Sequence, residues 1–120
     1  MNSVFGSLFI VSTPLGNLKD ITLRAIDIMK NSYLIAAENT RKSQILLKEY
    51  KIKTKMISYH EYNSHNRIET IIAHLKDGKN VSLISDAGTP GISDPSYRLI
   101  RSAIENEITV SSIPGPSAFI

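Results

Sequence analysis

The sequence predicts an α/β fold: a mainly parallel five-stranded sheet with helices on both faces. Short, wholly apolar runs alternate along the chain with segments of helical periodicity. Such continuous apolar runs are typical of parallel strands, because helices cover both faces of a parallel sheet. The length of 120 residues, with 42% hydrophobic and 21% charged residues, suits one small globular domain.

Each expected element follows from a local pattern. The strands are the apolar runs at residues 8–11, 33–37, 55–59, 81–84 and 109–113. The helices are the segments with apolar residues three or four apart, at 20–29, 42–50, 67–76 and 96–105. Asp20 is the expected cap of the first helix, and Asp94, followed by Pro95, is the expected cap of the last.

The composition limits the classes of function. The chain has no cysteine, which excludes disulfides and thiolate chemistry. Its formal charge of +3 and its pI near 9.2 permit a nucleic-acid partner without requiring one. Residues 1–7 lack the pattern of a signal peptide, and no apolar run is long enough to span a membrane. We therefore expect a cytoplasmic protein with no membrane partner.

Unusual residues gather in the segments that leave the expected strands. Segments that enter the strands are ordinary polar turns, such as residues 77–80. Segments that leave them carry proline, glycine, histidine and charged residues, at 13–17, 38–41, 60–61, 86–94 and 114–117. In open α/β sheets ligands bind beyond the carboxyl ends of the strands, so we expect a ligand site at this edge.

Residues 85–95 form the most distinctive of these segments. They hold two glycines, two prolines and two aspartates between an expected strand and an expected helix. Glycine lets a ligand approach the main chain closely, and the free N–H groups of a helix start favour a negative ligand group. A long, well-capped turn without a ligand is the alternative interpretation.

Two common kinds of site are not indicated. Neither a G-x-G-x-x-G fingerprint nor a lysine-bearing phosphate loop occurs, so we expect no nucleoside triphosphate site. The three histidines lack the spacing of a metal site, and we predict none. His60, beside Glu61 at a strand end, is the one histidine that we consider for a functional role.

Four motifs together resemble one protein family. They are TPLGNLKDITLRA at residues 13–25, AAENTR at 36–41, SDAGTPGISDP at 85–95 and PGPSA at 114–118. In this order and spacing the chain is similar to the tetrapyrrole methylase family, from about residue 8 to its end. Each motif alone is weak evidence, whereas the four in sequence are highly specific.

The resemblance implies a two-domain protein that uses S-adenosylmethionine. Residues 1–120 would form the amino-terminal domain, and a second domain, absent from this chain, would close the cofactor cleft. The isolated domain would be inactive. The resemblance assigns cofactor binding to residues of the loops after the first, fourth and fifth strands: Pro14, Leu15, Gly16, Asp86, Ala87, Gly88, Thr89, Pro90, Ile92, Ser117 and Ala118.

The motifs are most similar to the branch of the family that acts on ribosomal RNA. That likeness implies 2′-O-methylation of a cytidine in 16S rRNA of the small ribosomal subunit, by a homodimer of the full-length protein. A ribose hydroxyl is a poor nucleophile, so a base would help, and Glu38 at the ligand edge is our candidate for the catalytic residue. Arg41 and His60 are candidates for contact with the substrate. Asn39 stands where the family usually has aspartate, which puts any role as a base at that position in doubt.

Two other functions remain open from the sequence. A tetrapyrrole of the uroporphyrinogen or precorrin type would replace RNA as the methyl acceptor and leave the chemistry unchanged. A non-catalytic nucleotide-binding or dimerisation module would bind a ligand without transferring a methyl group. Methyl acceptance by uroporphyrinogen, or cofactor binding without transfer, would distinguish them.

Overall fold

The computed structural model describes residues 4–13, 21–86 and 93–113. Strands and helices alternate along these residues: β1 (Leu8–Thr13), α1 (Leu23–Asn31), β2 (Leu34–Ala37), α2 (Thr40–Glu49), β3 (Lys55–Ser58), α3 (Ser64–Lys76), β4 (Val81–Asp86), α4 (Asp94–Glu105) and β5 (Val110–Ile113). The five strands form one sheet in the order β3-β2-β4-β1-β5, and every neighbouring pair is parallel. The predicted α/β class is confirmed.

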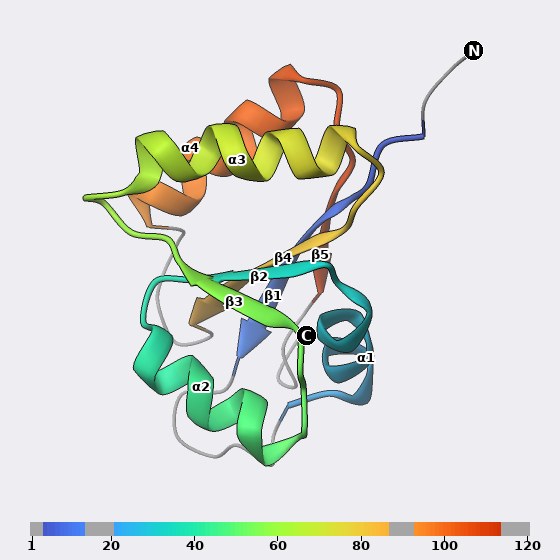
Figure 1. Ribbon diagram of the computed structural model, residues 1–120, viewed down its shortest axis with the longest axis vertical. Coiled ribbons are helices and arrows are strands. Elements are labelled where there is room, and N and C mark those ends of the chain that lie inside the picture. Colours follow the sequence, from blue (N-terminus) through green and yellow to red (C-terminus); the bar gives the residue numbers. More distant parts are fainter. Residues whose placement is uncertain (1–3, 14–20, 87–92, 114–120) are drawn as a thin grey trace, which may run out of the picture.

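The sheet lies between two layers of helices, as Figure 1 shows: α3 and α4 cover one face, and α1 and α2 cover the other. Each face has its own apolar cluster. Leu75 of α3 and Leu99 of α4 lie in one cluster, and Met29 of α1 and Leu47 of α2 lie in the other. All four of these side chains are at most 2% exposed, so both layers seal the sheet from water.

Strand β2 shows why the apolar runs are continuous. Leu34 and Ala36 point into the α3 and α4 cluster, whereas Ile35 and Ala37 point into the α1 and α2 cluster. Side chains alternate between the two faces of a strand, so a strand covered on both faces must be apolar at every position.

Two helices begin at caps other than the predicted ones. Thr22, not Asp20, caps α1, because its Oγ1 accepts a hydrogen bond from the backbone N–H of Ala25 at 3.1 Å. Ser93, not Asp94, caps α4, and its Oγ accepts from the Ser96 N–H at 3.3 Å. Serine, threonine and aspartate all cap well, so neighbouring candidates compete and the backbone conformation decides between them.

The strands of the sheet centre extend further than their apolar runs. The ladder between β1 and β4 continues through the polar pairs Ser12 with Ser85 and Thr13 with Asp86. Helix α3 likewise begins at Ser64, three residues before the predicted start. Apolar periodicity therefore locates each element but underestimates its polar ends. No helix in the described part of the chain has the length and apolar character needed to cross a membrane.

Candidate functional site at the carboxyl edge of the sheet

All five strands point the same way, so their carboxyl ends lie along one edge. In the strand register Thr13 pairs with Asp86, Val11 with Ile113, and Ala37 with Ser58. Because β1 lies between β4 and β5, the segments that leave these three strands start side by side. These are the segments to which the sequence assigns cofactor binding.

The connections from β1 and β4 diverge from this edge. The chain leaving β1 leads to α1 on one face of the sheet, whereas the chain leaving the adjacent β4 leads to α4 on the opposite face (Figure 1). This is a topological switch point, the place where open α/β sheets bind their ligands. The topology therefore fits a ligand held by the segments after β1, β4 and β5.

Most of the predicted cofactor residues lie outside the described residues. These are Pro14, Leu15, Gly16, Ala87, Gly88, Thr89, Pro90, Ile92, Ser117 and Ala118. Asp86 is described as the last residue of β4. Beside it, buried Thr13 donates a hydrogen bond from Oγ1 to the Ser85 carbonyl at 3.4 Å. This contact, which the sequence did not indicate, ties the ends of β1 and β4 together.

Glu38 follows directly after β2 and is exposed at the carboxyl edge. It forms no ion pair with Arg41 among the residues the structure describes. The next residue, Asn39, caps α2, with its Oδ1 accepting from the Lys42 N–H at 3.0 Å. Asparagine and aspartate cap helices about equally well, which explains why an amide is tolerated here. Position 39 thus has a structural role, and Glu38 is left with a carboxylate facing solvent.

The His60 ring is held within a local turn. Its Nδ1 accepts a hydrogen bond from the Tyr62 N–H at 3.2 Å, and its backbone N–H donates to Asn63 Oδ1 at 2.8 Å. The ring also packs edge-on against Tyr62, with centroids 6.0 Å apart. These contacts give His60 a role in shaping the β3–α3 connection, and its contact with substrate stays a prediction.

Tyr59 and Arg98 are edge residues that sequence reasoning missed. The buried Tyr59 hydroxyl donates to the Pro95 carbonyl. Burial raises the pKa of Tyr59 to about 12, and the positive charge of Arg98 partly offsets that rise. Arg98 Nη2 donates to Ser64 Oγ at 3.3 Å, while its buried Nε has no hydrogen-bond partner among the described residues. Within the described ranges this guanidinium has no carboxylate partner, and it lies between the starts of α3 and α4.

No group of three His, Cys, Asp or Glu side chains in the described residues is arranged to hold a metal ion. His74, a residue of α3, packs instead against Tyr33 with ring centroids 4.9 Å apart. His65 is exposed near the start of α3.

The family model described as Tetrapyrrole (Corrin/Porphyrin) Methylases matches residues 7–120. The chain belongs to this family. Crystal structures of tetrapyrrole methylases share its fold: uroporphyrin-III-C-methyltransferase from Thermus thermophilus has a TM-score of 0.68 over 92% of this chain and 47% of that one. Cobalt precorrin-4 methyltransferase has a TM-score of 0.71 over 91% of this chain and 45% of that one. Both are 15% identical to this chain, so they show the fold alone.

Relatives of higher identity carry another name within the same family. A protein of Thermotoga maritima named Ribosomal RNA small subunit methyltransferase I is 49% identical over 113 residues, 94% of this chain and 51% of that protein. Its namesake from Escherichia coli O157:H7 is 46% identical over 115 residues, 96% of this chain and 40% of that protein. The chain thus spans 40–51% of the length of these two relatives.

Proposed function

We propose that this chain is the amino-terminal domain of an enzyme that methylates the 2′-hydroxyl of a cytidine in 16S rRNA. The observation that carries the proposal is the 46–49% identity, over nearly the whole chain, to proteins named for methylation of small-subunit ribosomal RNA. The solved tetrapyrrole methylases with the same fold are only 15% identical. Sequence similarity therefore favours RNA over a tetrapyrrole as the methyl acceptor.

The proposed cofactor is S-adenosylmethionine, which supplies a methyl group activated by its sulfonium. Residues of the three segments after β1, β4 and β5 would hold it, with Asp86 as a partner for its ammonium group. The support from the structure is topological, because β4, β1 and β5 are neighbours and their carboxyl ends share one edge. Small residues in these segments allow main-chain groups to reach an adenosine directly.

The proposed role of Glu38 is to orient the ribose hydroxyl and accept its proton. With S-adenosylmethionine bound to supply the activated methyl group, the Glu38 carboxylate would accept the proton that the 2′-hydroxyl loses on methylation. The main requirement is alignment of the 2′-oxygen with the methyl group, which a fixed edge provides. Glu38 suits this role because it is exposed, follows β2 directly and has no ion-pair partner among the described residues.

We further propose that Arg41 contacts RNA phosphate and that His60 lies near the substrate. The full-length protein would act on 16S rRNA as a homodimer in the cytoplasm, and a second domain would complete the cleft. Arg41 is exposed in the first turn of α2, three residues after Glu38, so a phosphate bound there would lie near the reacting ribose.

The test is a comparison of methyl acceptors with the full-length protein and labelled S-adenosylmethionine. Small ribosomal subunits that lack the modification should take up label, and uroporphyrinogen should not. Transfer to uroporphyrinogen alone would establish the tetrapyrrole function. Cofactor binding with transfer to neither acceptor would favour a non-catalytic module.

A further inference from the structure

One segment carries all of the net positive charge of the chain. Residues 41–55 contain six Lys or Arg and one acidic residue, Glu49, whereas the rest of the chain contains eight Lys or Arg and ten Asp or Glu. The segment comprises nearly all of α2, the turn that follows it, and the start of β3. Since β3 is an edge strand of the sheet, this charge lies on one outer side of the domain.

Two shallow hollows lie along this side. The first, of about 540 Å³, is lined by Thr40, Arg41, Gln44, Ile45, Lys48 and Met56. The second, of about 560 Å³, is lined by Gln44, Leu47, Lys48, Lys51, Ile52 and Lys53. They share Gln44 and Lys48 and so lie next to each other along α2; together we call them the α2–β3 groove. No acidic residue lines it, and its apolar lining includes Ile45, whose side chain is 59% exposed.

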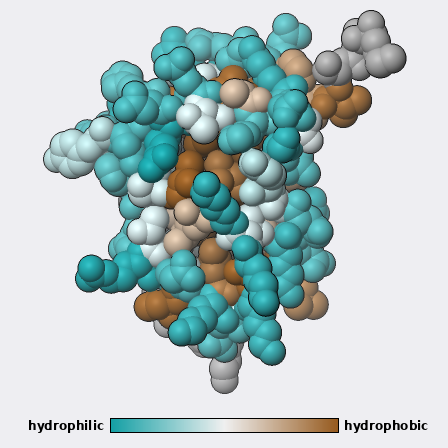
Figure 2. Space-filling model, viewed as in Figure 1, coloured by the Kyte–Doolittle hydropathy of each residue, from teal (hydrophilic) through white to brown (hydrophobic). Residues whose placement is uncertain are grey.

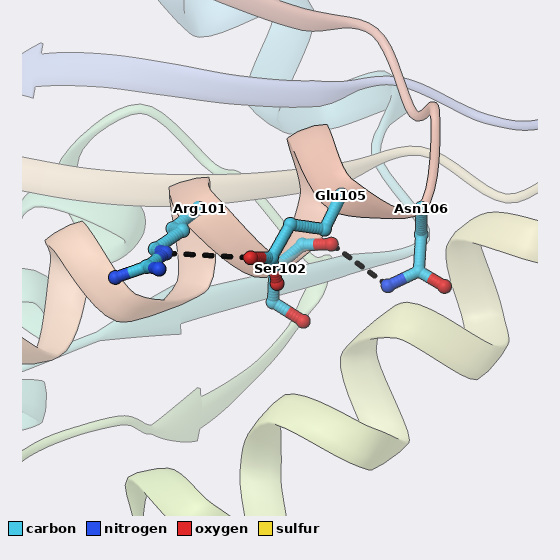
Figure 3. Close-up of polar contacts among 4 residues, drawn as sticks. All are labelled: Arg101, Ser102, Glu105 and Asn106. Atoms are coloured by element: carbon cyan, nitrogen blue, oxygen red, sulfur yellow. Dashed lines mark hydrogen bonds and ion pairs between the residues drawn. The ribbon is translucent and has the colours of Figure 1, made fainter.

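The cations of the groove lack partners within the described part of the chain. No hydrogen bond or ion pair there engages the charged groups of Arg41, Lys48, Lys51 or Lys53. Arg101 of α4 contrasts with them, because its Nε lies 3.3 Å from Glu105 Oε2 one helical turn away, as Figure 3 shows beside the Asn106 bond to the Ser102 carbonyl. The groove therefore presents positive charge that the fold itself does not neutralise.

The start of α2 also carries positive charge that no acidic neighbour in its first turn offsets. Its first turn contains Arg41 and Lys42 and no acidic residue. Positive side chains are unfavourable near a helix N-terminus, because the helix dipole is positive there. Proteins tolerate such local conflicts mainly where function requires them.

The groove leads away from the proposed reaction site. Helix α2 has ten residues and is therefore about 15 Å long. It begins at Thr40, beside Glu38 at the carboxyl edge, and ends near Lys51 at the opposite edge. Figure 1 shows α2 below the β3 edge, and Figure 2 shows from the same side a largely hydrophilic surface with apolar atoms between the helix layers.

We propose that the α2–β3 groove docks the phosphate backbone of the RNA strand next to the methylated nucleotide. The inference rests on the proposed function and adds the surface that holds its substrate. Several unpaired cations spread along about 15 Å suit a polymer with regularly spaced negative charges better than one small anion. The apolar lining at Ile45 and Met56 would contact ribose and base faces between the phosphates.

The test compares two triple variants of the full-length protein. The first removes groove charge: Lys48→Gln, Lys51→Gln and Lys53→Gln. The second is a matched control that removes three exposed cations from α1, α3 and α4: Lys30→Gln, Lys76→Gln and Arg101→Gln. Affinity for a mixed-sequence single-stranded oligoribonucleotide is measured between about 50 and 200 mM salt. The kcat and KM for methylation of unmodified small subunits are measured beside it.

The groove variant should bind the oligoribonucleotide at least about tenfold more weakly. The slope of log affinity against log salt should also shrink by about 2, because three lysines are removed and each phosphate contact contributes about 0.7 for single strands. Its KM for subunits should rise in parallel while kcat stays within about twofold, since none of the three lysines lies at the carboxyl edge. The control variant should stay close to wild type in both measurements. Lys51→Gly should also weaken binding, although glycine suits the φ of 56° at that position and preserves the turn.

Three results would overturn the proposal. One is a groove variant with the affinity and salt slope of the wild type. Another is an equal loss of RNA affinity in the control variant, which would indicate that net charge alone, and not the groove, determines binding. The third is displacement of the RNA by polyglutamate of equal charge at equal concentration, which would indicate a surface for acidic protein. If the wild type still methylates RNA in these cases, the proposed function stands and only the groove assignment is lost. If it neither binds nor methylates RNA, both proposals are wrong.

Discussion

The phenol of Tyr59 donates a hydrogen bond to the backbone carbonyl of Pro95 and so joins the residue after β3 to the first turn of α4. Both residues are buried. The two segments are separated by β2 in the sheet order, so this bond spans the α3 and α4 face at the carboxyl edge. It helps to fix the position of α4, whose first two residues, Asp94 and Pro95, are the last two of the motif at residues 85–95.

Tyr59→Phe should lower the free energy of unfolding by about 1 kcal/mol at neutral pH, because a buried hydrogen bond is lost. The wild type should also lose stability above pH 10, approaching its full loss near pH 12, because the folded state holds the phenol proton more tightly than the unfolded state. The variant lacks this titration. Urea unfolding at a series of pH values tests both effects. If the free energy of unfolding fell equally with pH above 10 in the two proteins, Tyr59 would not be the source of the alkaline loss.

The regular parts of the fold were predictable, because they depend on local apolar pattern. Strand β2 was recognised from its unbroken apolar run, which burial on both faces explains. The polar ends of β1 and β4 were not predictable. Thr13 and Asp86 belong to these strands because they pair with each other, and no local apolar pattern indicates that pairing. A sequence pattern contains no information about the partner strand.

The edge that the candidate residues share was predictable from the sequence, but the electrostatics of that edge were not. Glu38 and Arg41 were placed at the edge correctly, because a parallel sheet brings all strand ends together. Nothing in the sequence singles out Arg98, whose Nη2 donates a hydrogen bond to Ser64 Oγ of another helix. That contact depends on the packing of α3 against α4, which no local pattern specifies.

The cap of α2 can be tested at Asn39. Asn39→Ala should cost about 1 kcal/mol of stability, because the side-chain bond to the Lys42 N–H is lost. Asn39→Asp should be neutral or slightly stabilising, since aspartate caps equally well and its charge favours the helix dipole. Denaturant midpoints measure both. If aspartate were as harmful as alanine, the cap would not be the role of this residue.

The turn after α2 offers a second test of stability. Lys51 has φ 56°, the left-handed region that favours glycine, and Gly78 occupies the same place after α3 with φ 85°. Lys51→Gly should therefore be neutral or stabilise the fold by up to about 1 kcal/mol, whereas Gly78→Ala should destabilise it by about 1 kcal/mol. Thermal unfolding of the two variants compares them directly. A large loss of stability in Lys51→Gly would mean that the lysine side chain itself supports the turn.

The proposed base can be tested by Glu38→Gln in the full-length protein. Turnover should fall by roughly 100-fold or more with KM for RNA nearly unchanged, because the amide keeps the shape but cannot accept the proton. Glu49→Gln, at the far end of α2, is the matched control and should retain full turnover. A normal rate in Glu38→Gln would remove this residue from the mechanism.

The central claim, methylation of a ribose in small-subunit RNA, is tested most directly by locating the transferred methyl group. The full-length protein is incubated with labelled S-adenosylmethionine and small subunits that lack the modification, and the RNA is then digested with alkali. A methyl group on the 2′-oxygen blocks cleavage at that nucleotide, so we predict label in an alkali-resistant dinucleotide that contains cytidine. Label in a mononucleotide would place the methyl group on a base and contradict the account.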